Sequence, residues 1–336
     1  MSLPTPDPLD LYLDLFERIS RRSRWKLNVQ GQRIIAMVLA TVPLDDPMGT
    51  VEEAAAVLRK KAGWFDPLRS PVRYSVAAML IRRGLPPGRV HDQVISILKR
   101  FKGRGLPWGG PGRVLAAVLL ALRAGESELP EEVLERMGRI HRLWKADHPV
   151  ITGDDDFPML ALHALGDESP GALSDRIEAT YRELHHGGFP RGNALQLSTQ
   201  ILGVLPWSAG EAAGRFHAVR NSFRRFDEKI GRSRFDEVAL LSLAPGSPDE
   251  IVEQVLTDRD KLRARKPRPS KEVSFSLASG LLLSRMDSTA AAGKLAGEAE
   301  SADLPEIAAL SQVRAVLEAQ QAAMSAALLG SMAAQG

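Results

Sequence analysis

Cysteine is absent from the 336 residues of this sequence. Its absence excludes disulfide bonds, thiolate metal sites and cysteine nucleophiles. No uninterrupted apolar run is long enough to span a bilayer. The first residues contain no basic region followed by an apolar stretch, so we expect no secretory signal. These absences predict a cytoplasmic protein without a transmembrane segment.

A large excess of one charge is missing as well. The sequence has 44 basic and 41 acidic residues, which gives a formal net charge of +3. This balance makes nucleic acid an unlikely partner. Local basic runs at 21–24, 99–102 and 261–268 are typical of solvated helix ends. Contact with phosphate or RNA is the alternative interpretation of these runs.

Signals for β-strands are scarce, because β-branched residues rarely alternate with polar ones and no Asn-Gly or Asp-Gly pair is present. Apolar residues recur instead at helical spacing almost throughout. Two kinds of helix alternate along the chain. One kind is short and apolar on every side, which is typical of a helix that is buried on every side. We expect helices of this kind at 34–42, 74–81, 114–122, 157–165, 195–205, 238–243 and 275–283.

The second kind of helix is longer, charged and amphipathic. We expect such helices at 51–61, 90–102, 131–145, 173–185, 212–229 and 250–263. They should cover the apolar helices, which recur about every forty residues, the length of a two-helix repeat. The sequence therefore predicts an all-α protein of stacked αα-hairpins that form a curved solenoid or an α/α toroid-like domain. This helical-repeat domain is expected over 1–290, with an Ala-rich helical segment at 291–336 that docks on it or pairs with another copy.

The connecting segments are of two kinds. Those that follow the apolar helices are rich in Gly and Pro and are typical of structural turns. Those that lead into the apolar helices carry arginines, histidines, acidic residues and tryptophan, and alternate connections of hairpin repeats share one end of the stack. Helix starts attract anions, and arginine forks suit phosphate or carboxylate. The candidate ligand-binding residues are Arg69, Arg73, Trp108, Arg113, Thr152, His185, Arg191, Asn193, Gln196 and Arg232.

The segment 147–158 is the most distinctive, since it places His148 close before Asp154, Asp155 and Asp156. Three adjacent carboxylates repel one another, so we consider three roles for them. Thr152 or Asp154 can cap the helix that begins near 157. Asp155 and Asp156 can hold Mg²⁺, although no complete calcium-loop spacing is present. The aspartates and His148 are also candidate catalytic groups for proton donation, or they contact a partner.

Established catalytic and zinc motifs do not occur. The Gly-rich stretches 109–112 and 187–189 follow no strand, so they predict tight turns and no nucleotide-binding loop. No nucleophile elbow is present. No His-x-x-x-His or His-Glu-x-x-His pattern supports zinc.

Three motifs in this order resemble a bacterial family of uncharacterised proteins known as domain of unknown function 4003. They lie at 63–80, 148–158 and 192–198, and the resemblance runs from about residue 10 to residue 285. Val150 and Ile151 replace Phe and Leu of the family pattern. The positions that match it are His148, Thr152, Asp155, Asp156, Gly192, Asn193, Gln196 and Ser198. The resemblance implies a shared architecture and a shared polar site, without a known reaction.

Three functions remain open. The first is a helical-repeat module that binds a small molecule or a protein through the loop face. The second is an enzyme that uses Asp155 or Asp156 on a phosphorylated substrate, with Mg²⁺ as a possible cofactor. An isoprenoid substrate is one version, although aromatic residues are only 5% of the chain, few for lining a carbocation cavity. The third is a scaffold that forms a homo-oligomer through the C-terminal helix.

Overall fold

The computed structural model describes residues 7–23, 27–62, 67–104, 106, 110–149 and 152–295. In this part of the chain every regular element is helical, which confirms the all-α prediction. The odd-numbered helices are α1 (Pro8–Ser23), α3 (Pro47–Lys61), α5 (Pro87–Lys102), α7 (Glu131–Asp147), α9 (Pro170–His186), α11 (Ala209–Arg225) and α13 (Pro248–Ala264). The even-numbered helices are α2 (Val29–Leu39), α4 (Val72–Arg83), α6 (Pro111–Ala124), α8 (Phe157–Ala164), α10 (Asn193–Leu202), α12 (Phe235–Ser242) and α14 (Lys271–Leu295).

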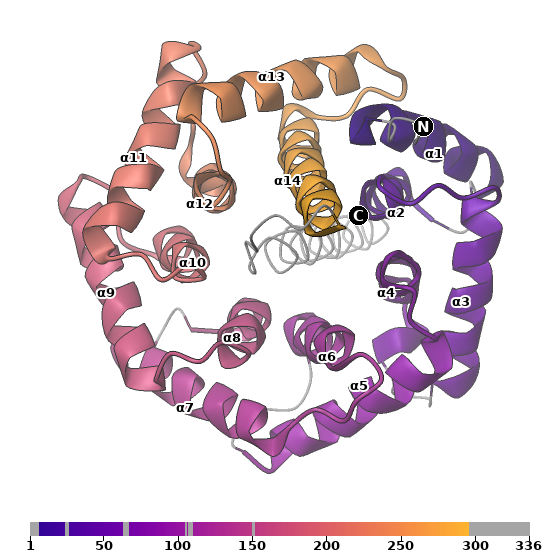
Figure 1. The fold of residues 1–336 in the computed structure, drawn as a ribbon, viewed down its shortest axis with the longest axis horizontal. Helices are drawn as coiled ribbons and strands as arrows, with labels where there is room; N and C mark the ends of the chain where they lie inside the picture. The colour runs from indigo at the N-terminus through magenta and orange to yellow at the C-terminus, as the bar shows by residue number, and fades with distance from the viewer. Residues whose placement is uncertain are drawn as a thin grey trace, which may run out of the picture.

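The helices alternate between two layers. In Figure 1 the odd-numbered helices lie outside and the even-numbered helices lie inside, around a common centre. Each inner helix packs against the outer helix that precedes it and against another inner helix. The predicted alternation is therefore confirmed, and α8 shows its cause, because all of its residues are buried. The structure adds α1, an outer helix that was not among the amphipathic helices expected from the sequence.

Helix ends differ from the expected ranges where a polar residue sets the boundary. The apolar stretch predicted a helix over 34–42, but α2 begins at Val29, because the side chain of Asn28 accepts a hydrogen bond from the Gly31 amide. Ser208 and Ser247 begin α11 and α13 with reciprocal capping boxes. The segment 265–270 connects α13 and α14, the two helices of the last pair.

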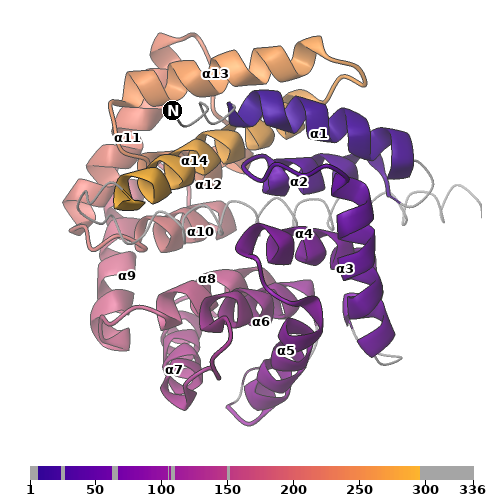
Figure 2. The same ribbon diagram turned by 45° about the vertical axis from the view of Figure 1, so that its right-hand side comes forward.

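The two ends of the described chain meet. Helix α14 contacts both α1 and α2, and Figures 1 and 2 show these helices side by side. The Arg285 side chain bonds to Asp7 through Nη2 at 2.8 Å and also pairs with the buried carboxylate of Asp258. Arg33 donates to the Pro267 carbonyl at 2.6 Å. These contacts join the first hairpin to the last.

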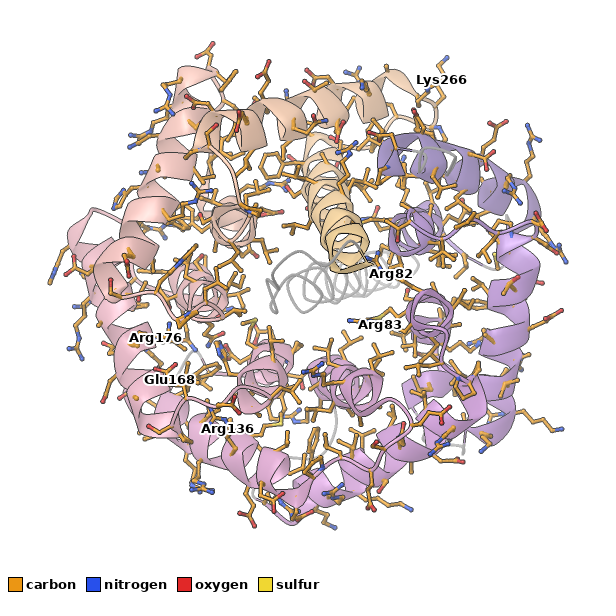
Figure 3. All side chains as sticks on the ribbon, viewed as in Figure 1. Arg82, Arg83, Arg136, Glu168, Arg176 and Lys266 are labelled. Carbon is orange, nitrogen blue, oxygen red and sulfur yellow. The ribbon has the colours of Figure 1, made fainter. Side chains whose placement is uncertain are left out.

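Three outer-helix arginines repeat one contact at the end where the inner helices finish. Arg136 Nε, Arg176 Nη2 and Arg215 Nε each donate to a carbonyl 27 residues further on, at 3.3, 2.9 and 3.2 Å. Figure 3 shows Arg136 and Arg176 beside Glu168, which is paired with Arg176. Because C-terminal carbonyls carry partial negative charge, these arginines stabilise the helix ends. A cavity of about 380 Å³ that Arg136 and Arg176 help to line is explained by this structural role.

No helix in the described ranges combines the length and the apolarity needed to cross a membrane. The part of the predicted C-terminal segment 291–336 that follows residue 295 lies outside the described residues. Its expected role in a homo-oligomer stays a prediction.

Candidate functional site

The Asp-rich segment lies between the starts of two inner helices. Asp154–Asp156 form a single 3-10 turn, η2, that contacts α6 of the preceding repeat and α8 of its own. A second such turn, η3 (Arg232–Arg234), lies in the corresponding connection of a later repeat and contacts α10 and α12. Each of these connections therefore reaches the start of the inner helix before it. We call the end of the molecule at which these connections lie the loop end.

Asp154 stabilises the start of α6. Its carboxylate accepts one hydrogen bond from the Gly112 amide and one from Arg113 Nη1, both at 2.7 Å. The Arg113 guanidinium lies 4.3 Å over the Phe157 ring, which links α6 to α8. A Cβ at position 112 would lie 1.9 Å from the Asp154 carbonyl oxygen, so this approach requires glycine. The expectation that Asp154 caps the helix near 157 was wrong, since it serves the helix of the preceding repeat.

Asp155 makes a different contact, at the surface. Its Oδ2 accepts a hydrogen bond from Asn193 Nδ2 at 2.8 Å, which joins the Asp-rich segment to the start of α10. Asn193 is exposed and Asp155 is half-buried. This pair, unlike Asp154, presents both charge and amide groups to solvent.

Asp156 is buried, with 1% of its surface exposed. It accepts hydrogen bonds from the Gly153 amide at 2.7 Å and from Gln200 Nε2 at 2.8 Å, with a longer one from Gln196 Nε2 at 3.4 Å. Burial raises the pKa of the Asp156 carboxyl to about 6, and the nearby charge of Asp155 adds to this. The three hydrogen bonds act in the opposite direction without compensating for the burial.

The amides around Asp156 are incompletely satisfied. Oε1 of Gln196 and Oε1 of Gln200 are buried and have no hydrogen-bond partner in the described part of the chain. Gln196 Nε2 also donates to Thr152 Oγ1 at 3.3 Å, and that hydroxyl donates to the Trp144 carbonyl at 3.2 Å. Two acceptors without a donor indicate that this site favours a protonated Asp156 or another donor group. The sequence prediction missed Gln200, whose only signal is a polar residue one turn after Gln196.

The two candidate histidines hold loops in place. His148 Nε2 lies 2.9 Å from Glu178 Oε2 on α9, and its ring packs against Tyr181 at 4.9 Å. His185 Nδ1 donates to the Phe189 carbonyl at 2.9 Å. Both histidines therefore have ordinary structural partners, and they do not lie together with the aspartates in one constellation.

The remaining candidates are spread round the loop end. Arg73 donates to the Arg69 and Ser70 carbonyls at 2.8 and 2.9 Å, so it stabilises its own turn. Arg191 and Arg232 are exposed. Trp108 lies outside the described residues. The structure thus joins Arg113, Thr152, Asn193 and Gln196 to the Asp-rich segment.

Within the described residues, no three histidine, aspartate or glutamate side chains are grouped so that they could hold a metal ion. The carboxylates of Asp155 and Asp156 each have amide partners of their own. Binding of Mg²⁺ by this pair stays a prediction.

A groove of about 1240 Å³ lies at the loop end where the first and last hairpins meet. Its apolar lining includes Phe16 of α1 and Val29 at the start of α2, and Arg265 and Lys266 contribute positive charge from the α13–α14 connection. Figure 3 labels Lys266 at this corner. No motif in the sequence marked this groove, because it arises only when distant repeats are brought together.

A comparison with known proteins shows the family to which the chain belongs. A family model described as "Protein of unknown function (DUF4003)" matches residues 15–322. The chain belongs to the DUF4003 family. This DUF4003 protein is 22% identical over 332 residues to "Uncharacterized protein YeaA" of Bacillus subtilis (strain 168), and the similarity covers 96% of this chain and 94% of the relative. No solved structure matches. The resemblance seen in the motifs is confirmed, and the DUF4003 match extends beyond residue 285, where the resemblance was expected to end.

Proposed function

We propose that the helices form a closed α/α toroid and that the protein binds a ligand at the loop end. The contacts of α14 with α1 and α2, together with the pairing of Arg285 with Asp7, support closure. Closure matters for function because it gathers connections from different repeats at one end. The inner helices begin there, and helix starts favour anionic or polar ligand groups.

The pair Asp155–Asn193 is the observation that carries this proposal. The two residues come from neighbouring repeats and lie 2.8 Å apart at the surface, where they do not contribute to the hydrophobic core. Arg191 adds an exposed cation in the same connection as Asn193. Carboxylate, amide and guanidinium groups together provide the few polar contacts that orient a small molecule or a protein ligand.

A thermal-shift screen tests the binding function. The probes are nucleotides, sugar phosphates, diphosphate esters and amino acids, each with and without Mg²⁺. We expect at least one compound to raise the melting temperature of the wild type, as ligands of the native state do. That shift should be lost in Asp155→Ala and Asn193→Ala and kept in Asp175→Asn, a control that removes an exposed charge from the first half of α9.

The proposal is contradicted if no probe stabilises the wild type. It is equally contradicted if a stabilising compound acts on both loop-end variants as strongly as on the wild type.

The second candidate function is that of an enzyme in which Asp156 donates a proton to a phosphorylated substrate. Isoprenoid diphosphates are one class of such substrates. The pKa of about 6 favours this candidate, because an acid catalyst needs a pKa near the working pH. Since the carboxyl is buried, a substrate would reach it only after the segment 152–156 moves aside.

Release of phosphate or diphosphate from such esters, in the presence of Mg²⁺, tests the second candidate. We expect release by the wild type and loss of release in Asp156→Asn, which should remain folded because it removes a costly buried charge. Equal release by both proteins, or none by the wild type, rejects this candidate.

A further inference from the structure

A group of basic side chains lies on one face of α11. His217, Arg220 and Arg224 are separated by three and four residues, so they follow one another along the same side of the helix. Arg220 and His217 are half-buried, and Arg224 is exposed. The face lies in the last two turns of α11, immediately before the α11–α12 connection, and so belongs to the loop end.

Phe189 fixes the position of this group. Its ring is 1% exposed and packs edge-on against Phe216 and Phe235, in both cases at 5.1 Å. The Arg220 guanidinium lies 4.6 Å over that ring, and the His217 ring lies 5.3 Å from it. Because the aromatic platform is held on several sides, the guanidinium above it is preorganised.

The end of α9 adds two imidazoles. His185 and His186 have their ring centroids 6.1 Å apart, and His185 donates to the Phe189 carbonyl. Gly187 allows α9 to approach α11, since a Cβ there would lie 2.7 Å from His217 Nε2. We call His185, His186, His217, Arg220 and Arg224 the basic cluster.

Among the residues that the structure describes, no carboxylate acts on Arg220 or His217. Burial lowers the pKa of Arg220, and the charge of Arg224 lowers it further. Burial also lowers the pKa of His217, as do Arg220 and Arg224. No acidic group opposes either shift. Two other half-buried arginines at the loop end do have a carboxylate partner: Arg113 bonds to Asp154 at 2.7 Å and Arg234 bonds to Glu237 at 2.8 Å.

Like charges that are held together without a counter-ion are unfavourable unless an anion joins them. The carbonyl dipoles at the ends of α9 and α11 offset part of this cost, but they carry only partial charges. Guanidinium forks match the oxygens of a phosphoryl group, and imidazoles supply additional donors. A doubly charged anion therefore suits the cluster better than a single carboxylate.

We propose that the basic cluster binds the phosphoryl group of a small phosphorylated molecule. The inference rests on the proposed function, because it names the ligand chemistry of the loop end. It places the phosphoryl group beside Phe189, on the same connection as Arg191 and Asn193, and leaves the rest of the ligand free to reach Asp155.

Calorimetric titration with inorganic pyrophosphate tests the site. We expect the wild type to bind and Arg220→Gln to bind more than about tenfold more weakly, because a charge-assisted hydrogen bond is lost. Arg224→Gln should also weaken binding. This second variant keeps the contact of Arg220 with Phe189, so a loss of pyrophosphate binding in it does not come from a folding defect around Phe189. Arg59→Gln is the matched control, since it removes an exposed arginine from the distant helix α3.

Three results would overturn the inference. One is the absence of pyrophosphate binding by the wild type. Another is an equal loss in Arg59→Gln and Arg220→Gln, which indicates attraction by net charge alone. The third is tight binding of single-stranded DNA without binding of pyrophosphate, which indicates a polyanion surface.

Failure of this inference differs from failure of the proposed function. If Asp155→Ala abolishes the thermal shift of a screened compound while Arg220→Gln leaves it intact, the loop end binds a ligand without using the basic cluster.

Discussion

Replacement of Arg285 by methionine is expected to lower the free energy of unfolding by about 3–5 kcal/mol. The Asp258 side chain is fully buried, and Arg285 supplies its positive partner. The remaining hydrogen bond, from Gln254 Nε2 at 3.0 Å, is neutral and cannot offset a buried charge. Arg285 also reaches Asp7, so the variant loses the contact between α14 and the start of the described chain.

Urea unfolding of Arg285→Met measures this loss. The double variant Arg285→Met with Asp258→Leu is the control, because it removes the buried charge together with its partner and should recover most of the stability. If the free energy of unfolding of the single variant lies within about 1 kcal/mol of the wild-type value, the packing between the first and last repeats does not depend on this ion pair.

Asp156→Asn is expected to have the opposite effect and to raise the free energy of unfolding at pH 7.5 by about 2–3 kcal/mol. The pKa of the carboxyl is about 6 in the folded protein, against an ordinary value of 3.8. At pH values between 3.8 and about 6, the Asp156 carboxyl therefore carries a proton more often in the folded state than in the unfolded state. The favourable contribution is therefore complete below the lower pKa and is lost as the pH rises through the upper one. Asparagine carries no charge and can donate to an amide oxygen that now lacks a partner.

Unfolding by urea at pH 5 and pH 7.5 checks the prediction. The gain in Asp156→Asn should be larger at pH 7.5, since the wild-type carboxyl is mostly protonated at pH 5. The neighbours supply matched controls of the same chemistry. Asp154→Asn should lose about 1 kcal/mol, because its bond to Arg113 weakens, and Asp155→Asn should change stability by less than about 0.5 kcal/mol. A loss of stability in Asp156→Asn at pH 7.5 contradicts the account.

The layers of the fold could be predicted from the sequence because burial leaves a direct pattern. Helix α8 is apolar on every side and is buried on every side. The contacts between the first and last hairpins could not be predicted in the same way, because they join residues that lie far apart in the sequence. Arg285 and Asp7 are 278 positions apart, and no local pattern relates them.

The candidate site was predicted only in part. The sequence indicated that the Asp-rich segment is unusual and that it faces the starts of inner helices. The sequence could not predict that the three adjacent aspartates have different roles, because their partners lie in other repeats. These partners are Gly112, Asn193 and Gln200, which are 42, 38 and 44 positions away. These separations are close to one repeat, so they follow from the stacking of repeats. A variant that changes all three aspartates at once would therefore mix a structural loss with a gain.

The basic cluster was missed for a related reason. His217, Arg220 and Arg224 belong to an amphipathic outer helix, where charged residues are expected to be solvated. Two features of the described residues distinguish them: no carboxylate acts on Arg220 or His217, and Phe189 from another repeat lies under the Arg220 guanidinium. Both features are visible only in three dimensions.

We infer that Asp154, Asp155 and Asp156 have three separate roles and that, of the three, only Asp156 is charged at a cost to stability. Titration of the side-chain carboxyl carbons by ¹³C NMR, with Asp156→Asn to assign the signal, measures the pKa on which this inference depends. We expect the Asp156 carboxyl to titrate at about pH 6 in the folded protein. A pKa of Asp156 near the ordinary value of about 4 would contradict it.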